Sequence, residues 1–310
     1  MSKKVFIDGS AGTTGLRIRE RLEKREDITL LTLPEERRKD PAARKQMLNE
    51  ADIAFLCLPD DAAREAVAMI ENPNTVVLDT STAHRTDPNW CYGFPELSAI
   101  GFEKVKEAKR IAVPGCHASG FIALVAPLIE AGILPKDAEL TCHSLTGYSG
   151  GGKKMIAQYE QAERDALLDA PRQYALGQSH KHLPEMKAVC GLEKEPIFCP
   201  IVADFYSGMA VTVPLFASQL QKGFGIEEIK DVYRKAYQGP IVEWSEAADA
   251  DGFYSAAAFG NRDKMQITVQ GNGERILLLA RYNNLGKGAS GAALECMNIV
   301  LGDTADYGLE

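Results

Sequence analysis

One cysteine stands where a thiol could act as a nucleophile. The segment IAVPGCHASG places Cys116 after a short apolar run and a Pro-Gly pair, at the start of an expected helix. A thiol at a helix N-terminus can have its pKa lowered from about 8.5 to roughly 3.5–7.5, and the thiolate is the reactive form. The alternative is a small buried hydrophobic residue, which suits Cys57 and Cys296 better.

Two histidines and a carboxylate form a second group that could exchange protons. The sequence HKHLPE contains His180, His182 and Glu185, and in an extended segment the two histidines would share one face. Either histidine could act as acid or base, with Glu185 orienting it or a substrate group. Two surface histidines before a helix are the alternative.

Zinc is a weaker alternative for these residue types. The chain has two Cys-His dipeptides, but adjacent residues rarely face one metal ion, and there is no C-x-x-C pair. We therefore expect no metal site.

A glycine-rich turn, GSAGTTG, follows the first expected strand. Small residues let backbone N–H groups approach a pyrophosphate, and a helix N-terminus favours its negative charge. An ordinary strand-to-helix turn with positive φ at glycine is the alternative. The residues expected to bind a dinucleotide here are Gly9, Ser10, Ala11, Gly12, Thr13, Thr14 and Gly15.

The segment after the second expected strand bears on the choice of cofactor. It reads EERRK, and at this place an acidic residue binds a ribose 2′-hydroxyl whereas an arginine binds a 2′-phosphate. The three consecutive cations favour NADP, with Arg37 and Arg38 as ligands; a solvated charged loop is the alternative. Pro59, after the third expected strand, and Lys287, at the start of the last expected helix, complete the cofactor-binding candidates.

Two further segments could bind a phosphate or a carboxylate group. DTSTAHR, after the fourth expected strand, contains Ser81 and Arg85, and hydroxyls with an arginine suit such anions. GYSGGGKK, before an expected helix, contains Ser149 and Lys153 and could form an anion-binding nest. A helix cap, a surface cation and a mobile turn are the corresponding alternatives.

The pattern of apolar segments predicts the elements that position these residues. In the first part of the chain we expect short strands at Lys4–Asp8, Ile28–Leu33, Ile53–Leu58, Val76–Asp79 and Arg110–Val113. Helices are expected between them near Thr14–Lys24, Pro41–Asn49 and Asp61–Ile70. This alternation predicts βαβ units and a parallel sheet.

The pattern changes after Cys116. Strands are expected at Glu139–Ser144, Pro196–Ala203, Ala210–Phe216, Gln266–Gln270 and Arg275–Tyr282. Helices are expected near Ala118–Ala131, Lys153–Leu168, Ile226–Tyr237 and Lys287–Leu301. The closer spacing of the strands predicts a mixed, largely antiparallel sheet.

Length and composition indicate two α/β domains in a chain of 310 residues, at about 150 residues per domain. We expect a Rossmann-type dinucleotide-binding domain (residues 1–115 plus 286–310) and an α+β catalytic and dimerisation domain (residues 116–285). The net charge of −8 disfavours nucleic acid and anionic membranes as partners. No apolar run approaches the roughly 18 residues of a membrane helix. Seven cysteines without a secretion signal indicate reduced thiols in the cytoplasm.

These segments together resemble one family, the shorter type of N-acetyl-γ-glutamyl-phosphate reductase from arginine biosynthesis. The resemblance covers nearly the whole chain and rests on Gly9–Gly15, Asp79–Arg85, Tyr92–Leu97, Pro114–Cys116, Ser149–Lys154, His180–Glu185 and Asn283–Gly291. The Pro-Gly-Cys and His-x-His-x-Pro-Glu pair is specific at this separation. Aspartate-semialdehyde dehydrogenase is the first alternative, although its usual arginine-and-histidine signature is not evident. A non-catalytic dinucleotide sensor on the same fold is the second.

The resemblance implies an NADPH-dependent reduction of an acyl phosphate to an aldehyde. The Cys116 thiolate would attack N-acetyl-L-glutamyl 5-phosphate and expel inorganic phosphate, and hydride transfer to the thioester would release N-acetyl-L-glutamate 5-semialdehyde. One histidine would protonate the hemithioacetal oxygen and later remove that proton, and we expect it to be His180. The family also implies a homodimer or homotetramer.

The resemblance leaves the substrate contacts and one base open. His182 and Glu185 are the expected substrate-binding neighbours of the acid/base. The candidates for the phosphate and carboxylate ends of the substrate are Ser81, Arg85, Ser149 and Lys153. Members of the longer type often have an aromatic residue after the cysteine, where this chain has His117. His117 is a less favoured alternative base, since adjacent residues rarely face each other.

Overall fold

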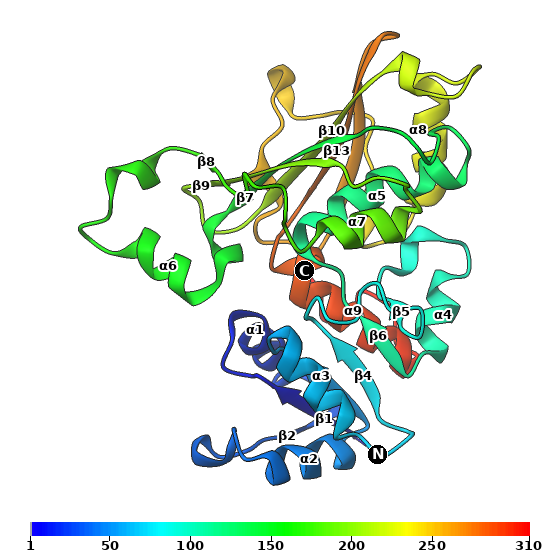
Figure 1. Ribbon diagram of the computed structural model, residues 1–310. Helices are drawn as coiled ribbons and strands as arrows, with labels where there is room; N and C mark the ends of the chain where they lie inside the picture. Colours follow the sequence, from blue (N-terminus) through cyan, green and yellow to red (C-terminus); the bar gives the residue numbers. More distant parts are fainter. Residues whose placement is uncertain (1) are drawn as a thin grey trace. The chain divides into compact units, whose positions relative to one another are not determined.

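The computed structural model describes residues 2–310, which fold into two compact units (Figure 1). The first unit comprises the described residues up to Pro95, together with Phe102–Gly115 and Ala289–Leu309. The second unit comprises Glu96–Gly101, Cys116–Gly288 and Glu310. The short segment Glu96–Gly101 therefore groups with the second unit, and the later division falls between Gly288 and Ala289.

The first unit contains a six-stranded sheet in the order β2-β1-β3-β4-β6-β5. Its strands are β1 (Lys3–Asp8), β2 (Ile28–Leu31), β3 (Ile53–Leu56), β4 (Val76–Asp79), β5 (Cys91–Tyr92) and β6 (Arg110–Ala112). Every pairing is parallel, which confirms the predicted α/β class. The strand order reverses at β1, because β2 lies on one side of it and β3 on the other. Doubly wound sheets bind ligands at the carboxyl edge of such a point.

Helices cover this parallel sheet, and its central strands are therefore buried on both faces. They are α1 (Thr13–Leu22), α2 (Pro41–Glu50), α3 (Asp60–Ala68), α4 (Gly101–Glu107) and α9 (Gly291–Leu301), with short 3-10 turns at Glu35–Arg37 and Pro95–Leu97. The small side chains Ala292 and Ala293 of α9 share one apolar core with Val5 and Ile53. The end of the chain thus completes a domain that its beginning starts.

The second unit contains a seven-stranded sheet in the order β11-β12-β13-β10-β7-β9-β8. Its strands are β7 (Thr141–Gly147), β8 (Arg172–Gln173), β9 (Ile197–Ala203), β10 (Met209–Phe216), β11 (Val242–Trp244), β12 (Met265–Gly271) and β13 (Arg275–Tyr282). The pairs β7–β9 and β11–β12 are parallel, and the other pairs are antiparallel. The predicted mixed, largely antiparallel sheet is confirmed.

A long apolar helix, α5 (Cys116–Glu130), lies at the centre of the second unit. It packs against β10 and β13 and contacts α7 (Leu183–Cys190) and α8 (Ile226–Ala236) (Figure 1). Two tyrosines of α8 bind its carbonyl groups: Tyr237 donates to Ala123 at 2.6 Å and Tyr233 donates to Leu124. These contacts on several sides hold the helix, and with it the first residue, in place.

Two predicted helices differ from the observed ones. The helix expected near Lys153–Leu168 is α6 (Gly152–Glu160), followed by a separate 3-10 turn at Ala166–Asp169. The Asp165 side chain caps that turn by accepting from the Leu167 N–H at 2.9 Å, which favours a new start over a continuous helix. The helix expected from Lys287 begins as a π-helix, Gly286–Ser290, before α9.

Several short elements were not predicted from the sequence. The strands β5, β8 and β11 are two or three residues long, and their pairing depends on neighbours distant in sequence. Further 3-10 turns lie at Tyr148–Gly151, Ala217–Gln219, Ala250–Gly252 and Ala256–Phe259. None of the helices among residues 2–310 has the length and apolarity that a bilayer crossing requires.

We predict that Gly9→Ala lowers the free energy of unfolding by about 3 kcal/mol, from backbone strain and overpacking together. Gly9 has φ of +89°, and a Cβ there would lie 2.2 Å from the carbonyl oxygen of Cys57. Gly12→Ala is the matched control, since φ is −74° and the nearest atom would lie at 3.5 Å. Urea unfolding measures both; equal losses would contradict the assignment.

Candidate active site

The candidate nucleophile opens the central helix of the second unit. Cys116 is the first residue of α5 and its side chain is half-buried. The Tyr282 hydroxyl donates to the Cys116 carbonyl at 2.5 Å and accepts from the Gly120 N–H at 3.0 Å. Burial raises the pKa of Tyr282 well above its usual value, so the phenol stays protonated. The phenol therefore bridges the first turn of α5 and holds the backbone of the cysteine.

Two glycines allow this close packing around Cys116. A Cβ at Gly120 would lie 2.7 Å from the Tyr282 hydroxyl oxygen, so a side chain there would displace the phenol. A Cβ at Gly288 would lie 3.1 Å from the Cys116 Cβ, so the π-helix approaches the cysteine only because residue 288 has no side chain. Both glycines are close-approach positions rather than turns.

The residue before Gly288 is fixed by a buried ion pair. The Lys287 ammonium donates to both carboxylate oxygens of Glu96 at 2.8 Å, and both side chains are almost fully buried. Removing one partner of such a pair leaves an uncompensated buried charge, so the pair is a strong structural constraint. The ammonium of Lys287, which was expected to bind the cofactor, is held by Glu96 in the structure, and its role as a cofactor ligand stays a prediction.

Imidazole rings gather in the second unit. The ring centroids of His180 and His182 lie 4.7 Å apart, and the ring of His117 lies 5.8 Å from the first and 5.7 Å from the second. His117 Nδ1 is 2.6 Å from the Ser144 hydroxyl, and its Nε2 is 2.6 Å from the Tyr174 hydroxyl. Since His117 follows the cysteine directly, this cluster lies beside the start of α5.

The proton of neutral His180 has a defined place. The backbone N–H of His182 donates to Nδ1 of His180 at 3.2 Å, so the neutral ring carries its proton at Nε2. Burial, and secondly the charge of Lys181, lowers the pKa of His180. The half-buried ring is therefore neutral at physiological pH and can donate a hydrogen bond from Nε2.

The alternative base, His117, does not have a nitrogen available for proton transfer with the thiol. Both of its ring nitrogens are bonded to hydroxyl groups. Burial, with a smaller effect of His180, lowers the pKa of His117 to about 3. The ring is a buried neutral link, and this alternative is not supported.

The other predicted residues of the second unit fall into two groups. His182 occupies the N-cap position of α7 and Glu185 lies in the first turn of that helix, and both side chains are buried. On a separate segment, the Ser149 hydroxyl accepts from Asn284 at 2.9 Å, and Lys153 is exposed in the first turn of α6. The structure thus brings the histidines together, places Glu185 in the first turn of α7, and places Ser149 and Lys153 after β7.

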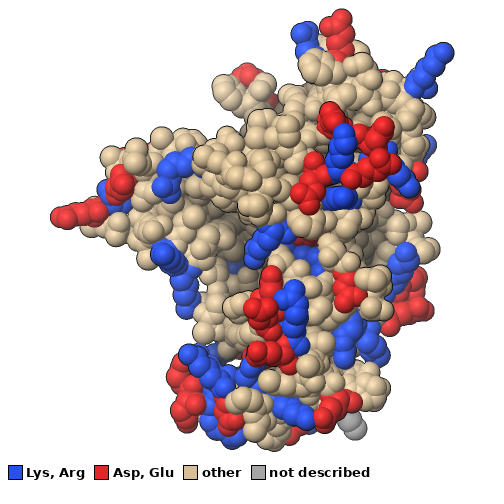
Figure 2. All heavy atoms as spheres, in the orientation of Figure 1, with Lys and Arg blue, Asp and Glu red and all other residues tan. Residues whose placement is uncertain are grey.

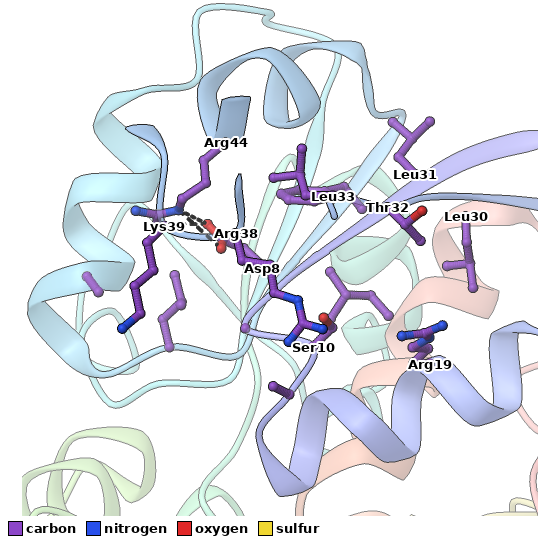
Figure 3. Close-up of a pocket in the computed structure, with 16 residues that line it drawn as sticks. Asp8, Ser10, Arg19, Leu30, Leu31, Thr32, Leu33, Arg38, Lys39 and Arg44 are labelled. Atoms are coloured by element: carbon purple, nitrogen blue, oxygen red, sulfur yellow. Dashed lines mark hydrogen bonds and ion pairs between the residues drawn. The ribbon is translucent and has the colours of Figure 1, made fainter. Parts of the chain in front are cut away.

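The glycine turn lines a cavity of about 360 Å³ in the first unit (Figure 3). Gly9, Ser10 and Ala11 form part of its wall, at the carboxyl end of β1 where the strand order reverses. A Cβ at Gly15 would lie 2.5 Å from the Gly9 carbonyl oxygen, so α1 can start this close to the strand only with glycine there. A small-residue loop at a helix N-terminus and a switch point fits a dinucleotide phosphate.

Cations line the same cavity. Arg19 of α1 and Arg44 of α2 join the wall, and Arg44 binds the buried Asp8 carboxylate at 2.8 Å, as the dashed lines in Figure 3 mark. Arg38 and Lys39 also line it. Arg19 and Arg44 were not predicted, because no local signal in the sequence shows which face of a helix meets a distant turn.

Not every predicted cofactor ligand lines this cavity. Arg37 is not among the residues that line it and pairs with Asp40 at 3.5 Å, whereas Arg38 pairs with Glu35 and lines the cavity. Gly12 caps α1, which Thr13 and Thr14 begin, and Pro59 precedes α3. The cavity wall is formed by Phe6, Ile7, Asp8, Gly9, Ser10, Ala11, Arg19, Leu30, Leu31, Thr32, Leu33, Arg38, Lys39, Arg44, Leu58 and Ala62.

Ser81 and Arg85 have structural partners within the first unit. The Ser81 hydroxyl donates to the Asp79 carboxylate at 2.7 Å and accepts from the backbone N–H two residues later at 3.1 Å. The Arg85 guanidinium donates to the carbonyl groups of Val113 and Thr80 at 2.9 Å each. These bonds tie together the ends of β4 and β6, and the substrate role expected for the two residues stays a prediction.

No cluster of three or more His, Cys, Asp or Glu residues among residues 2–310 could hold a metal ion. On the face drawn in Figure 2, basic and acidic side chains lie interspersed in small groups.

Two domain families match the chain. The family described as "Semialdehyde dehydrogenase, NAD binding domain" matches residues 4–105, and "Semialdehyde dehydrogenase, dimerisation domain" matches residues 116–284. The second match covers more than half of the chain. The first match indicates that the chain is an enzyme that binds a nicotinamide dinucleotide. This agrees with the glycine turn, whose geometry suits a phosphate group.

Full-length relatives narrow the family further. A protein named N-acetyl-gamma-glutamyl-phosphate reductase from Chelativorans sp. is 46% identical over 308 residues, covering 97% of this chain and 99% of its own. The chain belongs to the N-acetyl-γ-glutamyl-phosphate reductase family. A Sinorhizobium medicae member is 45% identical, with 97% and 99% of the two chains covered. A Pseudomonas putida member is 42% identical, with 98% of each chain covered.

Solved structures share the fold of this family at low identity. Aspartate semialdehyde dehydrogenase II of Vibrio cholerae superposes with a TM-score of 0.71 at 15% identity, covering 98% of this chain and 99% of its own. The Candida albicans enzyme, solved with NADP, gives 0.68 at 16% identity, covering 97% and 99%. The chain therefore shares its fold with these semialdehyde dehydrogenases.

We predict that Lys181→Gln raises the pKa of His180. The lysine charge is the second of two causes that lower this pKa, so its removal moves the value toward 6.5, while burial keeps it below that. Half-protonation of the ring then occurs at a higher pH, as an NMR titration of the imidazole Cε1–H measures. Lys187→Gln is the matched control, since Lys187 is not a cause of the shift. An unchanged midpoint in Lys181→Gln would contradict the prediction.

Proposed function

We propose that this protein reduces N-acetyl-L-glutamyl 5-phosphate to N-acetyl-L-glutamate 5-semialdehyde with NADPH, in arginine biosynthesis. The observation that carries the proposal is the pairing of Cys116, at the start of α5, with an imidazole cluster beside it. A half-buried cysteine held by Tyr282 and Gly288 suits covalent catalysis, and neutral His180 suits donation to a developing oxyanion.

Covalent catalysis divides the reaction into two steps. In the first, the Cys116 sulfur bonds to the acyl carbon, the bond from that carbon to the phosphate oxygen breaks, and the thiol proton leaves with phosphate. The Nε2–H of His180 donates to the acyl oxygen while that oxygen carries negative charge. When bound, the nicotinamide dinucleotide supplies the hydride that reduces the thioester. The carbon–sulfur bond then breaks to release the aldehyde, and the Cys116 thiolate takes up a proton from solvent to restore the thiol.

The remaining polar residues are proposed to hold the substrate. His182, whose ring packs against that of His180, and Glu185, three residues later in the first turn of α7, are buried polar groups that could bind an acyl chain held by Cys116. Lys153, exposed at the start of α6 after the glycine-rich loop, is proposed to bind an anionic end of the substrate, together with Ser149, four residues earlier. These roles rest on placement and chemistry together.

NADP is the proposed cofactor, rather than NAD. Arg38 and Lys39 line the cavity of the glycine turn beyond the end of β2, where a 2′-phosphate is bound in such folds. The Candida albicans structure with the same fold was solved with NADP, which agrees with this choice. Gly9, Ser10 and Ala11 are the proposed pyrophosphate contacts.

The second-unit sheet is the proposed assembly surface of a homodimer or homotetramer. Register places Phe216, Leu277 and Ile197 on one face of this sheet, and they are 62%, 40% and 60% exposed. Apolar side chains exposed on one sheet face favour association, and the matching family is described as a dimerisation domain. Light scattering of the purified protein measures the assembly. The seven cysteines are all free, which agrees with the proposed cytoplasmic location.

We predict that the wild-type protein reduces NADP when given N-acetylglutamate semialdehyde, and only when inorganic phosphate is present. Cys116→Ala is expected to lower kcat by at least about 10³-fold, because the covalent step is lost. Cys199→Ala is the matched control, since this half-buried thiol lies in the middle of β9. A spectrophotometric assay of NADPH formation measures all three proteins.

The same assay separates the alternatives. Faster turnover of aspartate semialdehyde than of the N-acetylated substrate would favour aspartate-semialdehyde dehydrogenase. Dinucleotide binding without turnover of either aldehyde, together with a Cys116 thiol that iodoacetamide alkylates no faster than a peptide thiol, would favour a sensor. Full turnover by Cys116→Ala would exclude the covalent mechanism.

We predict that Arg38→Ala raises the KM for NADP by about 10- to 100-fold, the effect of losing one charge-assisted hydrogen bond to phosphate. The KM for NAD should change by less than about threefold, since NAD lacks the 2′-phosphate. Arg37→Ala is the matched control, because Arg37 does not line the cavity. Equal effects on both cofactors, or a larger effect of Arg37→Ala, would contradict the assignment.

A further inference from the structure

We propose that His117 and Tyr174 act as a hydrogen-bonded pair that positions the acid/base His180 relative to the nucleophile Cys116. The inference rests on the proposed function, because it takes His180 as the group that donates to the acyl oxygen. It assigns roles to two residues on different elements, one at the start of α5 and one just after β8.

His117 connects the helix of the nucleophile to two other elements. Its backbone follows Cys116, its Nδ1 contacts the Ser144 hydroxyl of β7, and its Nε2 contacts the Tyr174 hydroxyl, both at 2.6 Å. The ring is buried, and Ser144 is fully buried. A phenylalanine at position 117 could fill similar space, but it could make neither hydrogen bond. The imidazole therefore adds a directional constraint that an apolar ring lacks.

Tyr174 begins the loop that carries the acid/base. Its N–H donates to the Pro200 carbonyl of β9 at 3.0 Å. Further along the loop, the Gln178 side chain binds the Phe198 backbone twice, donating to the carbonyl at 2.8 Å and accepting from the N–H at 2.9 Å. These bonds fasten the loop to β9. The bond between His117 and Tyr174 fastens it to α5.

Backbone strain supports a positioning role for this loop. Ala175 and Gln178 have φ of 52° and 51°, although neither is glycine. Residues held in this region persist only where surrounding contacts over-determine them, and they cluster at functional sites. The paired amide of Gln178 and the bond of Tyr174 supply those contacts, so the loop has one defined path to His180.

Ring contacts connect His180 directly to both His117 and Tyr174. The edge of His117 meets His180 with a centroid distance of 5.8 Å and an interplanar angle of 82°, and Tyr174 meets His180 at 6.1 Å and 60°. Phe198 closes the group at 5.1 Å from His180. His180 therefore packs on the two members of the pair, and a shift of either ring changes where its Nε2–H points.

The consequence for the reaction is geometric. A catalytic group displaced by about 1 Å can cost on the order of 100-fold in rate. Loss of the bond between His117 and Tyr174 should therefore lower kcat, while the KM for the acyl substrate and the reactivity of Cys116 change little. This pattern separates a positioning role from a general loss of structure.

The test compares His117→Phe and Tyr174→Phe, which keep the rings and remove the shared bond. Each should lower kcat by about 10- to 100-fold, with KM within about twofold, and the double variant should be no slower than the slower single one. His117→Gln, whose amide can still bond one hydroxyl, should retain more activity than His117→Phe. His143→Phe, the same substitution at an exposed histidine of β7, is the control.

Two further measurements keep the outcomes distinct. The rate of Cys116 alkylation by iodoacetamide should stay within about threefold of wild type; a change in parallel with kcat would mean a structural role and overturn the inference. Additive effects in the double variant, or a kcat within twofold of wild type in both single variants, would also overturn it.

If wild type itself lacks reductase activity, the proposed function fails, and NMR of the His180 ring decides the inference. Unchanged His180 signals in His117→Phe and Tyr174→Phe would then overturn it.

Discussion

The site depends on one hydroxyl group, that of Tyr282, at the first turn of α5. By accepting from the Gly120 N–H and donating to the Cys116 carbonyl, the phenol links β13 to the start of the helix. The bond has a fixed direction, because burial raises the pKa of the phenol and keeps it protonated. The helix itself is held by α8 along its length. A nucleophile on such a rigid element loses little conformational freedom when it reacts.

Different degrees of burial give two neighbouring histidines different roles. His117 is fully enclosed and hydrogen-bonded on both nitrogens, so its low pKa reflects a structural ring. His180 is half-buried, bonded only at Nδ1 among the contacts described for its ring nitrogens, and its pKa is lowered less. The same side-chain type thus serves once as a link and once as the proposed acid/base. The difference lies in solvent access and not in the chemistry of the ring.

Tertiary neighbours set the contacts that the predicted residues make. Lys287, expected as a cofactor ligand, forms a buried pair with Glu96, nearly two hundred residues earlier in the chain. Arg37 and Arg38 are adjacent cations, yet only Arg38 lines the cavity. Arg19 and Arg44, from two separate helices, were not predicted. Local sequence shows that a cation is present, but not which carboxylate or cavity it will meet.

The sequence alone was enough to predict the alternation of strands and helices, the two sheets, the glycine turn, and the cysteine at the start of a helix. These depend on side-chain periodicity and backbone preference over a few residues, which any local segment already contains. Only the tertiary structure decided that Tyr282 and Gly288 hold the cysteine, that His117 is a buried link, and that Tyr174 joins it. Those contacts connect residues up to 172 positions apart, from Cys116 to Gly288, and packing alone sets them.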